Sequence, residues 1–209
     1  MANVKKRRAV LILCLSLALI LLACGAAAAV LAVREAPYRR FNAMLEQPAK
    51  ALTLTVTSDL EGDVLHAEYR ISNGEGAKDV RYTYEQLAAI KLEGDEILLP
   101  PSRIESKEGH VRISGGRVVL LDGEQPNLST EVLTLSRLRF AAKCFRDPVD
   151  EVGKFYAEVT DPAALFGFAG DAVLMQLTLT YAQERVEGLT LEYKNERGEA
   201  FTLHYAFEY

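Results

Sequence analysis

The chain has 209 residues, a net charge of −5 and a hydrophobic fraction of 49%. Residues 1–33 carry four basic and no acidic residues, so residues 34–209 hold a net charge of −9. Contacts to phosphate supply most of the affinity of nucleic-acid-binding proteins, and an acidic domain therefore excludes nucleic acid as a partner. Residues 34–209 are enough for one domain with an ordinary core.

The N-terminal segment predicts a membrane anchor. The basic residues 5–8 precede the uncharged residues 9–33, which would measure about 37 Å as a helix, enough to cross a hydrocarbon core of about 30 Å. Basic residues flank spans on the cytoplasmic side. The sequence thus predicts a cytoplasmic flank (1–8), a single-pass span of the cell membrane (9–33), a linker or short helix (34–50) and an extracytoplasmic domain (51–209).

A second interpretation of the same segment starts from LLAC, residues 21–24, and the following Gly25. This stretch resembles the lipobox of bacterial lipoproteins. The resemblance implies cleavage before Cys24 and attachment of lipid to it, with residues 9–20 as the apolar region of the signal. Both interpretations tie residues 34–209 to a membrane outside the cytoplasm.

Strands are predicted from the start of the domain. Apolar and other residues alternate over 52–57, 65–71 and 80–84, the period of a strand with one buried face. A short helical turn at 85–90 and a small hairpin near 93–96 could follow. Two glycines at 115–116 predict a tight hairpin that pairs Ile113 with Val118 and Val111 with Leu120.

Residues 129–145 predict the main helix of the domain. Ser129 can cap it and Glu131 lies in its first turn, where a negative charge is favourable. Apolar residues occur on two sides of this helix, and Leu133, Phe140 and Cys144 lie near one side. These three are candidates for a lid over a cavity or a face for a protein partner. The alternative is a helix buried by the later strands.

The remaining sequence predicts an antiparallel meander, with a strand at 154–160, a short helix capped by Asp161, and three strands with apolar stripes. Aromatic residues recur on the apolar stripes of the whole domain and either fill a core or line a cavity for an amphipathic ligand. They are Tyr69, Tyr82, Tyr84, Tyr181, Tyr193, Phe201, Tyr205 and Phe207.

The fold class that these elements predict is mainly β (α+β). We expect an antiparallel, curved open sheet or incomplete barrel of roughly nine or ten strands, covered by helices and preceded by the transmembrane or signal helix. A sandwich of two sheets is the alternative arrangement of the same strands.

The order of elements resembles the lipoprotein-carrier fold of bacterial envelopes, of the outer-membrane lipoprotein-sorting type. The resemblance lies in LTLTVTS, VLHAEYRIS, VRYTY, GHVRISGGRVVLL, the helix at 129–145 and the C-terminal hairpins. It implies an incomplete antiparallel barrel with helices over its open mouth. No functional residue of that family has a matching position in this chain.

Neither a metal site, a cofactor nor a catalytic motif is predicted, and we do not expect an enzyme. His66, His110 and His204 are each isolated on a strand, whereas metal ligands converge. Cys144 is the only cysteine beyond residue 33, which excludes an internal disulfide in the domain.

The sequence favours a membrane-tethered, extracytoplasmic binding module of the cell envelope, for a lipid-like or other apolar ligand. The alternative is a non-enzymatic interaction or assembly protein that docks an envelope protein through its sheet and the helix at 129–145.

Overall fold

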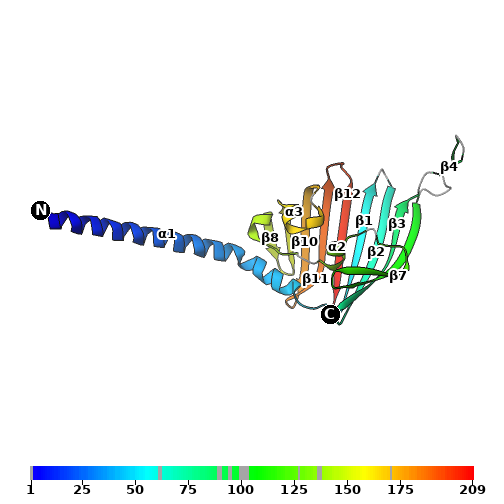
Figure 1. Ribbon diagram of the computed structural model, residues 1–209, viewed down its shortest axis with the longest axis horizontal. Coiled ribbons are helices and arrows are strands. Elements are labelled where there is room, and N and C mark those ends of the chain that lie inside the picture. The colour runs from blue at the N-terminus through cyan, green and yellow to red at the C-terminus, as the bar shows by residue number, and fades with distance from the viewer. Residues whose placement is uncertain are drawn as a thin grey trace.

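The computed structural model describes residues 2–60, 63–88, 91–93, 96–98, 104–126, 128–135, 138–169 and 171–209. Helix α1 (Ala2–Leu45) projects away from a broad sheet and joins it only through its C-terminal turns (Figure 1). The part Leu19–Leu45 is long and apolar enough to cross a membrane, and a signal sequence would satisfy the same criteria. The side chains of residues 19–34 are exposed, as a segment that contacts lipid requires.

Ten strands form a single antiparallel sheet, in the order β7-β6-β3-β2-β1-β12-β11-β10-β9-β8. They are β1 (Ala51–Leu60), β2 (Asp63–Gly74), β3 (Ala77–Leu87), β6 (Ile104–Ser114), β7 (Arg117–Gly123), β8 (Phe145–Glu151), β9 (Lys154–Val159), β10 (Ala172–Ala182), β11 (Arg185–Asn195) and β12 (Ala200–Glu208). Strands β4 (Lys91–Glu93) and β5 (Glu96–Leu98) form a separate pair. The predicted fold class, a mainly β protein with an open antiparallel sheet, is confirmed.

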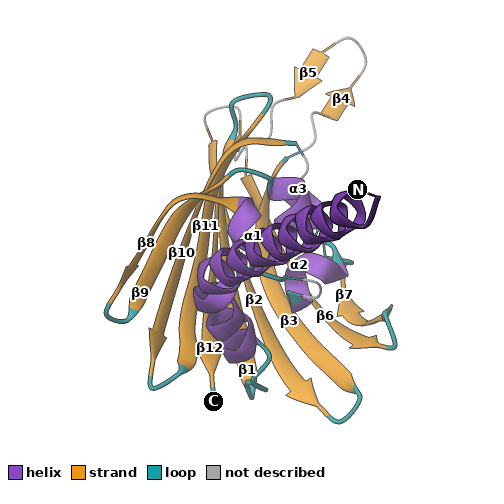
Figure 2. Ribbon diagram, turned by 90° about the vertical axis from the view of Figure 1, so that its left-hand side faces the viewer, coloured by secondary structure: helices purple, strands orange, loops and turns teal. Residues whose placement is uncertain are grey.

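The first and last strands of the domain hold the sheet together. Strands β7 to β1 form one meander and β12 to β8 another, and the two meet where β1 pairs with β12, with Leu54 opposite Tyr205. Strands β7 and β8 are consecutive among the strands of this sheet but lie at its opposite edges. The chain between them must therefore cross one face of the sheet, and in Figure 2 helices α1, α2 and α3 all lie in front of that face.

The crossing explains why the prediction of a helix over 129–145 is wrong. Helix α2 spans only Thr130–Thr134 and ends at Leu135, whose φ is 49°. A 3₁₀ turn, η1 (Ala142–Cys144), follows, and β8 starts at Phe145. A ten-stranded sheet is about 43 Å wide along its curve, whereas a 17-residue helix is only about 26 Å long. The described residues of this connection form the short helix α2, the turn η1 and irregular chain, which together make the crossing that one helix is too short to make.

The local patterns in the strands are confirmed. Residues Gly115 and Gly116 have positive φ, and the hairpin pairs Ile113 with Val118 and Val111 with Leu120. Helix α3 (Pro162–Leu165) begins with the predicted cap, since the Asp161 carboxylate accepts a hydrogen bond from the Ala164 amide over 2.9 Å.

The helical turn expected at 85–90 is wrong over its first part, because β3 continues to Leu87 and pairs there with β6.

The segment 34–50, predicted as a linker or short helix, belongs mainly to α1. The ring of Phe41 lies 4.8 Å from that of Phe155 and 5.6 Å from that of Tyr181, between ring centroids. Tyr38 and Met44 are also buried. The spacing of three residues places these side chains on one face of the helix, so the end of α1 is part of the domain core.

A reciprocal pair of hydrogen bonds fastens α1 to the crossing segment. The Asn42 side-chain amide donates to the Phe140 carbonyl over 2.9 Å, and its oxygen accepts from the Phe140 amide over 2.8 Å. The Glu35 carboxylate accepts from the Ala142 amide over 3.2 Å. Backbone groups that leave water need such partners, so these side chains allow the crossing segment to be buried without strand pairing.

We expect Asn42→Ala to lower the free energy of unfolding by about 2 kcal/mol, because both backbone groups of the buried Phe140 lose their partner. Gln47→Ala is the matched control, since its amide donates to an exposed carbonyl of Glu184, and it should cost less than about 0.5 kcal/mol. Urea unfolding of the full chain in a neutral detergent measures both. Equal losses would show that the Asn42 contact has no special role.

Candidate functional site

The covered face of the sheet carries the aromatic residues that the sequence singled out. Tyr69, Tyr82, Tyr84, Tyr181 and Tyr205 are buried, and Tyr193, Phe201 and Phe207 are partly buried against the same core. The sheet separates them into groups. Tyr69, Tyr193 and Phe201 line one cavity, Phe207 lines another, and Tyr205 lies under α2.

The three candidates for a lid or partner face are not on the surface. Leu133, Phe140 and Cys144 have exposed fractions of 0%, 3% and 3%. They lie on the crossing segment, whose apolar side chains pack onto the sheet. The prediction of a docking face at these residues is therefore wrong, because the segment is the cover of the core.

A cavity of about 510 Å³ lies between the sheet and the N-terminal part of α2. Its walls come from β1, β2, β3, β11, β12 and the start of the crossing segment. Most of the lining side chains are apolar: Val56, Leu60, Leu65, Ala67, Tyr69, Leu87, Leu128, Val132, Tyr193, Phe201 and Leu203. On one side the rings of Tyr193 and Phe201 stack with centroids 4.9 Å apart. This size and lining are typical of a site for an apolar small molecule.

Polar groups enter this cavity where two strands separate. The pairing of β2 with β3 starts at Ala67 and Tyr84, so beyond them the strands are not paired with each other. The Glu85 carboxylate bridges the gap by accepting a hydrogen bond from the His66 amide over 3.0 Å. Glu85 and Gln86 line the cavity at this point. Glu85 and Gln86 therefore give the cavity a polar end.

Burial disfavours ionisation of the tyrosines of this region even more than is usual for a phenol. It raises the pKa of Tyr193 to about 12, with a smaller effect from the Asp171 carboxylate. It also raises the pKa of Tyr69 well above its ordinary value, with smaller effects from Tyr84 and Tyr82. A neutral phenol both donates and accepts hydrogen bonds, so these residues offer apolar rings with neutral hydroxyls.

One hydrogen bond holds α2 above the sheet. The Tyr205 hydroxyl donates to the Val132 carbonyl over 3.1 Å, and both residues are buried. Burial raises the pKa of Tyr205 far above its ordinary value, so the phenol stays protonated as this bond requires. The bond is a fixed point for the cover beside the cavity.

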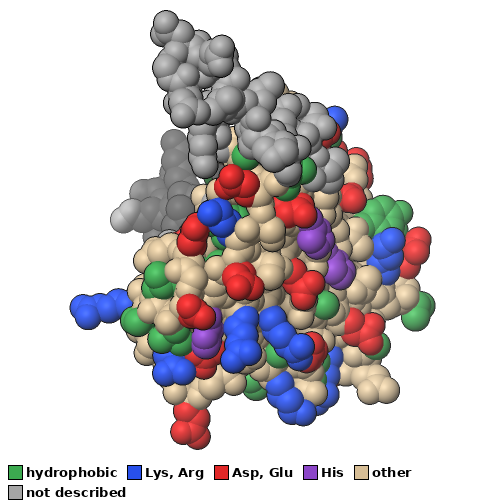
Figure 3. All heavy atoms as spheres, turned by 90° about the vertical axis from the view of Figure 1, so that its right-hand side faces the viewer, with side chains coloured by type: hydrophobic (Ala, Val, Ile, Leu, Met, Phe, Trp, Pro, Cys, Tyr) green, Lys and Arg blue, Asp and Glu red, His purple; other side chains and the backbone are tan. Residues whose placement is uncertain are grey.

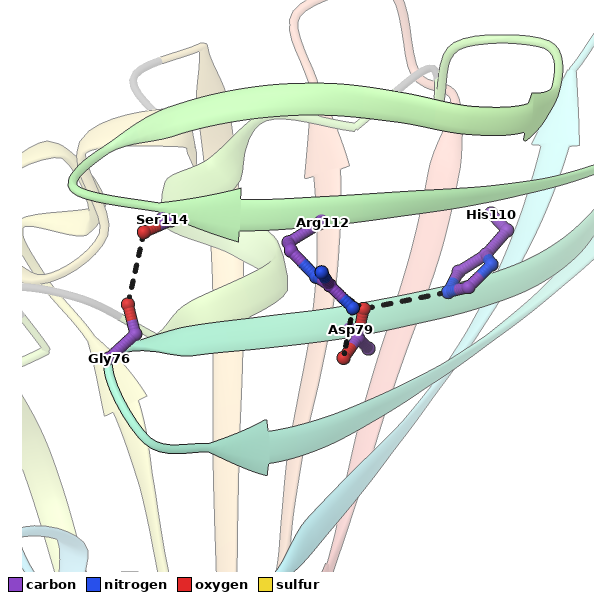
Figure 4. Close-up of polar contacts among 5 residues, drawn as sticks. All are labelled: Gly76, Asp79, His110, Arg112 and Ser114. Carbon is purple, nitrogen blue, oxygen red and sulfur yellow. Dashed lines mark hydrogen bonds and ion pairs between the residues drawn. The ribbon is translucent and has the colours of Figure 1, made fainter.

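The opposite face of the sheet is polar. Figure 3 shows acidic and basic side chains interspersed over it. Arg112 Nε lies 3.0 Å from Asp79 Oδ1, and His110 Nε2 lies 3.6 Å from the same oxygen (Figure 4). The hydrogen bond from Arg112 lowers the pKa of Asp79. A cavity of about 560 Å³ on this side is lined mainly by charged and polar residues, among them Glu68, Arg81 and Asp122.

Several other predicted positions are placed by the structure. Cys24 is exposed on α1, as lipidation would require and as a lipid-facing residue would also be. His66 and His204 are exposed, and His110 is half-buried. Within the described ranges no three His, Cys, Asp or Glu side chains cluster closely enough to hold a metal ion.

The similarity of the chain to known proteins is low. No family model matches it, and no curated protein matches it. Among solved structures, it is similar to a redesigned β-barrel, mFAP1, bound to DFHBI, with 10% identity and a TM-score of 0.23 over 78% of this chain and 97% of the other. It is also similar to an N-terminal dehydratase from the difficidin assembly line, with 8% identity and a TM-score of 0.14 over 80% and 81%. These low scores carry no functional argument.

We expect Tyr205→Phe to lower the free energy of unfolding by about 1 kcal/mol through loss of the hydrogen bond to Val132. Amide hydrogen exchange should accelerate over residues 130–134, because α2 loses its fixed point. Tyr156→Phe is the control, as this tyrosine is 40% exposed. Unchanged exchange in α2 would contradict the role given to the Tyr205 hydroxyl.

Proposed function

We propose that this protein is a membrane-tethered, extracytoplasmic module that binds a lipid-like or other apolar ligand. The observation that carries the proposal is the cavity of about 510 Å³ under α2, whose lining is mainly apolar. An apolar ligand gains free energy there because it leaves water without breaking hydrogen bonds of the site.

The arrangement of the polar groups supports an amphipathic ligand. Glu85 and Gln86 lie at the gap between β2 and β3, whereas Val56, Ala67 and Leu203 lie on the sheet beneath α2. A ligand with one polar end fits with its apolar part under α2 and its polar end at this gap.

The proposal of a membrane tether rests on the length and continuity of helix α1. Its apolar part and the turns that pack in the core belong to one helix, which runs without interruption from Ala2 to Leu45. The basic residues 5–8 favour a cytoplasmic N-terminus. We therefore propose that the helix is retained as a span and that the domain lies outside the cytoplasm.

We expect Val56→Phe to lower the occupancy of bound ligand about tenfold, the cost of overpacking a filled cavity. Native mass spectrometry of the full chain, released from a neutral maltoside detergent, resolves ligand that co-purifies. Thr57→Phe is the matched control, because Thr57 pairs with the exposed His66 and lies on the opposite face of the same strand. Val56→Ala enlarges the cavity and should keep the ligand. Equal occupancy in all four proteins would contradict a ligand site at this position.

A retained helix predicts an intact mass near 23.1 kDa for the protein extracted from membranes. Cys24→Ser should leave processing and membrane attachment unchanged, because the span needs no lipid. A chain that begins at Cys24 and carries acyl mass, lost in the variant, would instead establish a lipoprotein. In that case the domain would be attached to the membrane by a lipid and not by a transmembrane helix.

A further inference from the structure

A second cavity, of about 480 Å³, lies on the other side of α2. It is formed by the end of α1, the chain that leads into β1, strands β1, β2, β3 and β12, and the crossing segment after α2. Leu45, Leu52, Ile71, Leu135, Leu138 and Phe207 supply apolar walls. The first cavity contacts α2 at Val132, so the short helix separates the two.

Lys78 breaks the pattern of the strand that it belongs to. In β3 the residues Val80, Tyr82 and Tyr84 alternate onto the covered face and are buried. Lys78 continues this alternation and lines the second cavity. Since side chains of a strand alternate between its faces, the lysine is the one member of this series that brings a charge to the apolar side.

The Lys78 ammonium has no anion to neutralise it among the described residues. Its pKa is lowered, and the only cause is desolvation by burial. The other two charges of the cavity satisfy each other, because Arg139 Nη1 lies 3.0 Å from Glu46 Oε1. The cavity therefore has one uncompensated positive charge beside apolar walls, inside a domain that is acidic as a whole.

We propose that the second cavity binds a single-chain carboxylate amphiphile, with the carboxylate on the Lys78 ammonium and the hydrocarbon chain against the apolar walls. One positive charge matches one negative charge, which favours a carboxylate over a phosphate dianion. The apolar walls favour a ligand with an alkyl chain over a free inorganic anion. Lys78 lines only the second of these two cavities, so this proposal does not depend on ligand binding in the first.

The test compares dodecanoate with dodecanol, which has the same chain and no charge. Native mass spectrometry of the full chain in a neutral maltoside detergent measures the affinity of each. Lys78→Met keeps the apolar stem and removes the charge, and it should weaken dodecanoate about tenfold while leaving dodecanol unchanged. Lys194→Met is the matched control, since Lys194 is exposed on β11 and outside the cavity. It should bind both ligands as the unaltered chain does.

Two further measurements locate the binding of dodecanoate at the Lys78 ammonium. The same loss on Lys78→Met in a Val56→Phe background would show that the first cavity is not involved. Dodecanoate affinity should fall as the pH rises through the lowered pKa of Lys78, and Lys78→Met should remove that dependence. The proposal is overturned if Lys78→Met leaves dodecanoate affinity unchanged, or if inorganic phosphate binds at Lys78 and dodecanoate does not.

Discussion

The two hydrogen bonds between Asn42 and the backbone of Phe140 join the two segments that cover the sheet. An open ten-stranded sheet with one apolar face is stable in water only if that face is covered. Because β7 and β8 lie at opposite edges, the connection between them crosses the face, and the end of α1 fills the space beside it. The side-chain amide of Asn42 takes up the hydrogen bonds of the Phe140 backbone, which has no neighbouring strand to pair with.

The same constraint produces the cavities. A single crossing segment covers only part of the apolar face, and the Tyr205 hydroxyl holds it to β12 through Val132. Space is left on both sides of α2, one part lined by Tyr69 and Phe201 and the other by Phe207 and Lys78. The position of each cavity depends on how the crossing segment covers the sheet. Its polarity depends on which residues of the strands line it.

Helix α1 and the segment that crosses the sheet form one physical unit. Helix α1 passes from an exposed apolar part to Phe41 in the aromatic cluster, and Leu45 lines the second cavity. A movement of the helix relative to the sheet would change the packing around Phe41 and Phe140. The packing of α1 is thus coupled to the shape of the space under the cover.

The sequence by itself determined the features that depend on neighbouring residues: the strands with alternating apolar residues, the turn at Gly115 and Gly116, the cap at Asp161 and the apolar length of the N-terminal helix. It also placed Tyr69 and Phe201 on apolar stripes. Only the tertiary structure decided that residues 129–145 cross the sheet, that β8 is an edge strand, and that α1 extends into the core. These depend on the order of strands in the sheet, which local periodicity does not contain. The alternation of β3 places Lys78 on the apolar side, but only the folded chain shows that no carboxylate in the described part meets it.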